Sequence, residues 1–149
     1  MNTLSRWFVT AILCLFSLSA YSESATVSAV GVKFEAPFVY IDVGGQVNWE
    51  NMAGHNVETI DALVPEGSPK VNSVLGENVS ITFDTPGLYV YKCTPHWGSR
   101  MGGIVMVGPV EDAIALAEQY LEKVNTEKGD LLPAKGLLKK FIKELESQG

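Results

Sequence analysis

Apolar and polar side chains alternate along much of the chain between residues 25 and 107. The clearest alternating segments are 30–34, 46–50 and 79–83. Alternation with a period of two predicts strands that place one face on a hydrophobic core. The turn sequence Asp-Thr-Pro-Gly at 84–87 leads into a further strand at 88–93, and the apolar run 104–107 indicates a buried last strand. Several short strands at close spacing predict a β-sandwich or a barrel.

The pattern changes to helical spacing after Gly108-Pro109. Apolar side chains then recur every three or four residues in two groups, which are Ile114, Ala117, Leu121 and Val124, and then Leu138, Phe141, Ile142 and Leu145. This spacing predicts two amphipathic helices, with Pro133 in the first turn of the second. Both helices need an apolar surface to cover, and the predicted sandwich is the one available. The predicted fold is therefore mainly β, with two C-terminal α-helices.

The first residues are typical of a secretory signal peptide. Arg6 supplies a positive charge, and Trp7 to Leu18 form an apolar run that is shorter than the roughly 20 residues needed to span a bilayer. Ala20-Tyr21-Ser22 fits the small-x-small cleavage pattern, so we predict a mature start near Glu23, with Ser22-Glu23-Ser24 as an alternative site. An uncleaved helix that anchors the protein in a membrane is the competing interpretation.

Charge and cysteine content narrow the function classes. Cleavage of the signal peptide would leave 10 basic and 17 acidic residues, a net charge near −7, which argues against nucleic acid and anionic membranes as partners. Cys14 would leave with the signal peptide, so Cys93 would be the single cysteine of an exported chain. Such a thiol is buried and inert, paired with another chain, or bound to a metal.

One segment, residues 93–101, carries the candidate chemistry. Cys93, His96 and Met101 place a thiolate, an imidazole and a thioether directly after a predicted strand. Their spacing lets one loop direct all three side chains to a common point. His55 lies at another predicted strand end, and a sandwich can bring two strand ends side by side. Each residue alone more often has a structural role, and Cys-x-x-His also occurs in zinc sites.

The combination predicts a type 1 (blue) copper site, in which two imidazoles and one thiolate bind the metal and a weak thioether is axial. Thiolate sulfur favours Cu(I), whereas imidazole suits both oxidation states. The compromise geometry lets copper change oxidation state with little movement of its ligands. We therefore predict one copper ion, alternating between Cu(I) and Cu(II), bound by His55, Cys93, His96 and Met101. Zinc is disfavoured because a thioether is a poor zinc ligand.

These segments resemble those of a known family, the cupredoxins. Gly54 to Ile60 is similar to the family's first ligand segment, and Lys92 to His96, followed by the aromatic Trp97 and by Met101, resembles its ligand loop. The resemblance extends from about Val32 to the last predicted helix. It implies a Greek-key β-sandwich (cupredoxin-like) that carries two C-terminal helices.

With the signal peptide at 1–22, the resemblance divides the rest of the chain into a cupredoxin copper-binding domain at 23–109 and a C-terminal helical extension at 110–149, packed on the sandwich. The resemblance also implies that Asn56 joins the two ligand loops through a hydrogen bond towards Thr94. Pro95, which has no N–H, would limit the hydrogen bonds to the thiolate.

Two features depart from the family's pattern. Ser99-Arg100 replaces a pair that usually ends in glycine, so Arg100 places a bulky cation close to the ligand loop. The family often surrounds its exposed histidine with lysines, which meet acidic partner surfaces. Here the copper domain has few cations, namely Lys33, Lys70, Lys92 and Arg100, against nine acidic residues.

The predicted function is one-electron transfer in the periplasm by a monomeric carrier with no membrane anchor after signal cleavage. The electron would pass through the edge of His96, within an exposed apolar patch that includes Pro95 and Trp97. The family's partners imply a c-type cytochrome as donor and a nitrite reductase or similar enzyme as acceptor. Weak redox encounters suit such a small patch.

Two other functions compete with electron transfer. A copper-handling or delivery protein could use the same soft ligands, but such proteins usually carry Met-rich or His-rich motifs, and the mature chain would have three methionines. An enzyme with a catalytic cysteine–histidine dyad would need an open thiolate and a binding cleft. Four protein ligands would also leave copper without a position for substrate, so we predict that the chain is not an enzyme.

Overall fold

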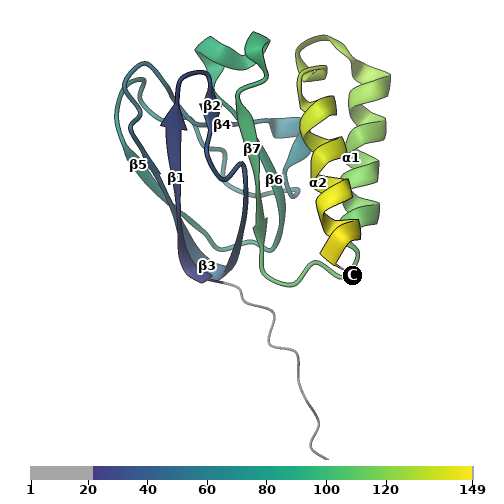
Figure 1. The fold of residues 1–149 in the computed structure, drawn as a ribbon. Coiled ribbons are helices and arrows are strands. Elements are labelled where there is room, and N and C mark those ends of the chain that lie inside the picture. The colour runs from purple at the N-terminus through teal and green to yellow at the C-terminus, as the bar shows by residue number, and fades with distance from the viewer. Residues whose placement is uncertain (1–21, 149) are drawn as a thin grey trace, which may run out of the picture.

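The computed structural model describes residues 22–148, which form one mixed sheet of seven strands and two C-terminal helices (Figure 1). The strands are β1 (Ser22–Val30), β2 (Lys33–Phe34), β3 (Phe38–Glu50), β4 (Glu58–Thr59), β5 (Val79–Phe83), β6 (Gly87–Lys92) and β7 (Gly102–Val107). The helices are α1 (Ala113–Glu127) and α2 (Ala134–Gln148), and the short 3₁₀ helices are η1 (Asp61–Leu63), η2 (Thr94–Ser99) and η3 (Gly129–Leu131). The expected signal peptide lies outside the described residues, apart from Ser22.

The long strand β3 belongs to both halves of the sandwich. Its first part, from Phe38 to Ile41, pairs in parallel with β7, whereas its second part pairs in parallel with β1 and antiparallel with β5. The change of partner requires a bend, and glycine allows it. Gly44 has a φ of 82°, and a Cβ on Gly45 would lie 2.8 Å from the carbonyl oxygen of Asp42. A strand that bends in this way can pass from one sheet to the other.

The core between the two halves draws buried side chains from both. Val27 of β1 and Trp49 of β3 lie in the same cluster as Tyr91 of β6 and Val105 of β7. The sheet path runs β2-β1-β3-β7-β6-β4 and leaves two open ends, so within residues 22–148 the fold is a sandwich and not a closed barrel. This confirms the predicted mainly β fold with two C-terminal helices.

Strands β6 and β7 are buried on both faces, because the helices cover the face that the sandwich core leaves free. Tyr89 and Tyr91 point into the sandwich core, whereas Leu88 and Val90 join a second cluster with residues of α1 and α2, such as Val124 and Phe141. Figure 1 shows the two helices side by side against β6 and β7. Burial on both faces explains why the runs 88–91 and 104–107 are apolar without alternation.

The predicted helical faces are the buried ones. Ala117, Val124, Leu138 and Phe141 are fully buried, and Leu121, Ile142 and Leu145 are partly buried against the same cluster, whereas Ile114 is half-buried. Asp112 caps α1 by accepting a hydrogen bond from the Ala115 amide at 2.8 Å. Across residues 22–148, no helix has both the length and the apolar character needed to cross a membrane.

One predicted strand is wrong. The segment 30–34 is not continuous, because Gly31 takes a φ of 58° and forms a turn between β1 and β2. Val32 therefore lies in the turn with 51% of its surface exposed, although its alternation with Val30 and Phe34 had predicted a core position. The two-residue turn pairs Ala29 with Phe34 on the buried side and Val30 with Lys33 on the exposed side. Val30 and Val32 are exposed although they are apolar, so the alternation of residue types runs through the turn and does not reveal it.

Two Gly→Ala changes should shift stability in opposite directions. At Gly103 a Cβ would collide with the Tyr91 hydroxyl and lie 2.6 Å from the carbonyl oxygen of Pro37, so Gly103→Ala should cost about 1–3 kcal/mol or more. Gly136 lies in α2 with open space around its Cβ position, and Gly136→Ala should stabilise by about 0.5–1 kcal/mol. Urea unfolding of the metal-free protein measures both, and equal effects of the two changes would contradict the packing described at Gly103.

Candidate metal centre

The ligand loop, residues 93–101, closes on the β6–β7 ladder. Lys92 pairs with Gly102 at the end of the ladder, and the Cys93 amide donates to the Met101 carbonyl at 2.9 Å. Six of the seven residues between Cys93 and Met101 form η2, and the His96 amide donates to the Cys93 carbonyl at 3.1 Å. The ladder therefore fixes Cys93 and Met101 side by side at the base of the loop, and η2 fixes His96 between them.

Arg100 ends η2 in the left-handed conformation, with a φ of 64°, and its amide donates to the Trp97 carbonyl at 2.8 Å. A side chain other than glycine costs roughly 1–2 kcal/mol in this conformation. The resemblance noted above places glycine here in related chains, and the backbone geometry gives the physical reason. The departure at Arg100 leaves the path of the loop intact.

His55 is held by a second loop that follows β3. Its amide donates to the Met52 carbonyl at 2.8 Å, and its carbonyl accepts from the Gly76 amide at 2.9 Å. The Asn78 side chain accepts from the Met52 amide at 3.2 Å and so fixes the start of this loop. These backbone contacts leave the His55 imidazole free to point at the ligand loop.

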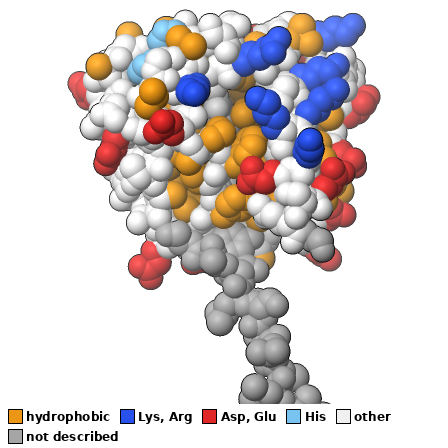
Figure 2. Space-filling model, in the orientation of Figure 1, with side chains coloured by type: hydrophobic (Ala, Val, Ile, Leu, Met, Phe, Trp, Pro, Cys, Tyr) orange, Lys and Arg blue, Asp and Glu red, His pale blue; other side chains and the backbone are white. Residues whose placement is uncertain are grey.

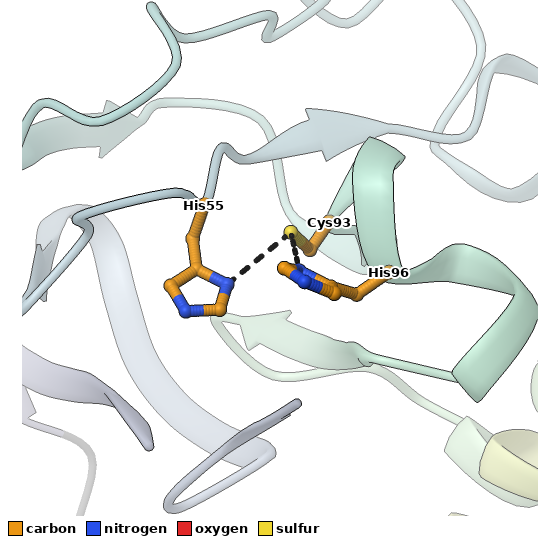
Figure 3. A group of neighbouring side chains, drawn as sticks. All are labelled: His55, Cys93 and His96. Atoms are coloured by element: carbon orange, nitrogen blue, oxygen red, sulfur yellow. Dashed lines mark hydrogen bonds between the residues drawn. The ribbon is translucent and has the colours of Figure 1, made fainter. Parts of the chain in front are cut away.

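The structure brings His55, Cys93 and His96 to one point (Figure 3). The Cys93 Sγ lies 3.6 Å from His55 Nδ1 and 3.4 Å from His96 Nδ1, and the two imidazole centroids are 4.8 Å apart. Met101, the fourth predicted residue, is buried in the same core cluster as Cys93, and its amide donates to the His96 carbonyl at 3.3 Å.

These distances fit a metal ion among the three side chains. Metal bonds of about 2.0 Å to nitrogen and 2.3 Å to sulfur, with angles between tetrahedral and trigonal, require N···S separations of about 3.5–3.7 Å. The observed separations of 3.6 and 3.4 Å lie in that range or just below it. One thiol and two imidazole nitrogens that converge without an acidic residue in the group are a donor set suited to copper or zinc.

The centre is enclosed except at one histidine. Cys93 and Met101 are essentially inaccessible, and His55 is 8% exposed, whereas His96 is half-buried. Burial, and to a smaller extent the charge of His96, lower the pKa of His55. The neutral imidazole, which is the form that binds a metal, therefore persists to lower pH at His55.

Asn56 joins the two ligand loops, as the resemblance implied. Its side-chain oxygen accepts from the Thr94 amide at 2.7 Å, and its side-chain nitrogen donates to the Thr94 hydroxyl at 3.1 Å. The Thr94 hydroxyl in turn donates to Glu58 at 2.8 Å. Because Asn56 and Thr94 each follow a predicted metal ligand directly in sequence, these bonds hold His55 and Cys93 at a fixed separation.

The structure contradicts the expected position of Trp97. Only 5% of Trp97 is exposed, and the side chain packs in the cluster beneath α1 and α2, so it is not part of an exposed patch around His96. Its indole N–H donates to the Asp130 carbonyl at 2.7 Å, in the connection between the helices. Tryptophan can bury its ring here because the indole N–H has a partner. Trp97 therefore anchors the ligand loop to the helices.

Lys92 makes a second link to the same connection. Its ammonium donates to Asp130 at 2.9 Å and lies 3.5 Å from Glu58. Burial acts to lower the pKa of Lys92, but the hydrogen bond to Asp130 and the charges of Glu58 and Asp130 outweigh it and raise the pKa. Sequence reasoning missed both partners of Lys92, because Asp130 lies 38 residues away along the chain and no local pattern signals that Glu58, in the His55 segment, meets Lys92.

The buried position of Trp97 can be tested by stability. Trp97→Ala should cost about 3–5 kcal/mol, because it leaves a large cavity under the helices. Trp97→Phe keeps most of the ring and should cost less, although it loses the hydrogen bond to Asp130, which is worth about 1 kcal/mol. The exposed neighbour Pro95 provides the control, since Pro95→Ala should change the free energy of unfolding by about 0.5 kcal/mol at most. Equal, small effects at both positions would contradict the buried indole.

Comparison with known proteins points to one group. A family model described as copper-binding proteins of the plastocyanin/azurin family matches residues 22–108. A pseudoazurin from Paracoccus pantotrophus is 38% identical over 86 residues, which cover 57% of this chain and 59% of the relative. A putative pseudoazurin from Rhizobium leguminosarum bv. viciae is 42% identical over 76 residues, half of each chain. The chain thus spans about half to three-fifths of the length of these curated relatives.

Solved pseudoazurin structures extend the similarity to the helices. The structure from Sinorhizobium meliloti has a TM-score of 0.65 at 27% identity and covers 85% of this chain and 98% of its own. That share of this chain reaches beyond residue 108, where the family model ends. The structure from Methylobacterium extorquens AM1 has a TM-score of 0.57 at 25% identity and covers 71% of this chain and 99% of its own.

Proposed function

The chain belongs to the plastocyanin/azurin family of copper-binding proteins, and we propose that it is a periplasmic one-electron carrier with a type 1 copper ion. The resemblance of the sequence to the cupredoxins, and among them to the pseudoazurins, predicted this family. The proposed ligands are His55, Cys93, His96 and Met101. One observation carries the proposal, namely two histidine Nδ1 atoms 3.4 and 3.6 Å from a buried thiol. Copper supplies the redox change, and the protein supplies the fixed positions.

The frame around the ligands favours electron transfer over metal delivery. The β-ladder fixes Cys93 and Met101, the Asn56–Thr94 bonds hold the two loops together, and Trp97 is buried under the helices. A preformed site changes little when the charge of the metal changes, which keeps the barrier to electron transfer low. A delivery protein, in contrast, must open to release its ion, and few parts of this site are free to open.

His96 provides the route for the electron, because it is the one proposed ligand that is more than slightly exposed.

The apolar surface next to the site is not the one that we expected. Trp97 is absent from it, whereas Val74 and Leu75 are 63% and 59% exposed, and the following residue, Gly76, is bonded to the His55 carbonyl. Figure 2 shows exposed hydrophobic side chains beside the histidine at the upper left of the molecule. We propose that this surface, with Pro95, meets redox partners.

The partners that we propose are a c-type cytochrome as donor and a nitrite reductase or similar enzyme as acceptor. The exported chain would act as a monomer without a membrane anchor, following cleavage near Ser22. An enzymatic role is not supported by the site, since the Cys93 thiol is fully buried. We also propose that the chain consists of a signal peptide at 1–22, a cupredoxin copper-binding domain at 23–109 and a C-terminal helical extension at 110–149.

Loading with Cu(II) tests the metal assignment. The protein should turn intensely blue or green through charge transfer from the Cys93 thiolate, bleach when ascorbate reduces it, and regain its colour on oxidation. Cys93→Ser should abolish the band, whereas Met106→Leu, a change at a buried methionine of β7, should keep it. A colourless Cu(II) form of the native chain would exclude a type 1 centre, and fast loss of Cu(I) to a chelator would favour the delivery function.

Electron self-exchange tests the proposed docking surface without a partner. Two copies meet at their His96 edges when an electron passes between them, so a new charge beside that edge should repel the second copy. Leu75→Glu should slow self-exchange about tenfold, as measured by NMR line broadening in mixtures of Cu(I) and Cu(II) protein. Val43→Glu is the control, because Val43 is equally exposed but contacts Gly108 at the far end of β7. Equal slowing by both changes would contradict the docking surface.

A further inference from the structure

A groove of about 210 Å³ lies between the end of the ligand loop and α2, separate from the histidine edge. Three cations surround it: Lys33 from β2, Arg100 from the ligand loop and Lys140 from α2. Its apolar lining comes from Phe34, Pro37, Phe38, Met101 and Leu137. Neither His55 nor His96 lines this basic groove, so a molecule bound there would leave the proposed path of the electron open.

The three cations have no internal partner among the described residues. The salt bridges of residues 22–148 involve Lys70 and Lys92, and none involves Lys33, Arg100 or Lys140. No Asp or Glu lines the groove, although the chain as a whole carries a net charge of −6. Figure 2 shows Lys and Arg side chains gathered over the upper part of α2 and beside it, with hydrophobic side chains between them. The basic groove is thus a local positive site on an acidic protein.

Arg100 supplies a second observation. It holds a left-handed conformation with a φ of 64° that glycine would adopt without strain. Its guanidinium presents several N–H donors to a carboxylate, in a geometry suited to two parallel hydrogen bonds. Arginine at this strained position supplies the groove with a cation, whereas glycine would supply none.

On the basis of the proposed electron-carrier function, we propose that the basic groove binds an acidic segment of a redox partner. This segment carries an aromatic side chain between its carboxylates. The carboxylates meet Lys33, Arg100 and Lys140, and the aromatic ring contacts the apolar lining. The volume is below the roughly 300–1,000 Å³ of small-molecule pockets and suits one large side chain. Inorganic anions would gain nothing from the apolar lining, and an anionic membrane would be repelled by the rest of the acidic surface.

This contact gives the partner an orientation as well as affinity. Docking at the His96 edge alone leaves the partner free to rotate about the point of contact. A second contact on the other residues of the ligand loop fixes the rotation and brings the two redox centres to one relative position. Because Met101 lines the groove, occupation of the groove also changes the surroundings of the proposed axial ligand.

The test uses the copper-loaded protein and a synthetic peptide, acetyl-Glu-Glu-Phe-Glu-Glu-amide. NMR titration of the Cu(I) form should shift the amide signals of Lys33, Arg100, Leu137 and Lys140. Lys140→Glu should weaken binding about tenfold, and Arg100→Glu should weaken it at least as much. Lys139→Glu is the matched control, because Lys139 is exposed on α2 but does not line the groove, and it should weaken binding less than about twofold. Retained colour and an unchanged unfolding temperature show that each variant is folded.

Several results would overturn the inference. Equal weakening by Lys139→Glu and Lys140→Glu would show a general electrostatic effect without a site. Equal binding of a peptide with Gln for Glu, or of one with Ala for Phe, would remove one of the two proposed contacts. Binding of phosphatidylglycerol vesicles that matches peptide binding would point to a membrane instead. A protein that is blue and redox-active but shows no shifts at the groove overturns the groove alone, whereas a colourless protein that binds the peptide overturns the electron-carrier function alone.

Discussion

The backbone hydrogen bond between Cys93 and Met101 is the constraint on which the metal centre depends. It closes a loop whose two ends are already fixed by the β6–β7 ladder, so the thiol and the thioether enter from one rigid base. Everything else at the centre is positioned relative to this base. His96 is set by one turn of 3₁₀ helix above it, and His55 is set by the bonds of Asn56 to Thr94. A centre assembled in this way does not need the metal to bring its ligands together.

The helices take part in the same frame. They cover the outer face of β6 and β7, which would otherwise expose Leu88 and Val90, and their connection receives both the Trp97 indole and the Lys92 ammonium. The burial energy of the helices therefore also restrains the ligand loop. Two elements that the sequence presents as separate, a metal-binding sandwich and a helical extension, meet directly at the residue that follows His96.

Local patterns predicted most of the elements and the mainly β fold class, because each depends on neighbours in sequence. Val79 to Phe83 alternates as a strand must, and Cys93, His96 and Met101 lie in one loop between paired strands, as their spacing suggested. Long-range contacts could not be predicted from these local patterns. Trp97 has the same local context whether it faces solvent or a helix, and the partner that decides, Asp130, lies 33 residues away. The turn at Gly31-Val32 escaped for a different reason, since two exposed valines, Val30 and Val32, continue the alternation of residue types on which the prediction relied.

The link between Trp97 and Asp130 also changes what the boundary near residue 109 means. The change from alternating to helical spacing there divides the sequence by pattern, but Trp97 of the ligand loop packs against the helices and bonds to Asp130 across it. Segments that share a buried side chain and its hydrogen bond unfold cooperatively, so they open in one step. The helical hairpin and the ligand loop thus form one unit of unfolding, and the protection of the centre from solvent is set in part by helices that contribute none of the proposed ligands.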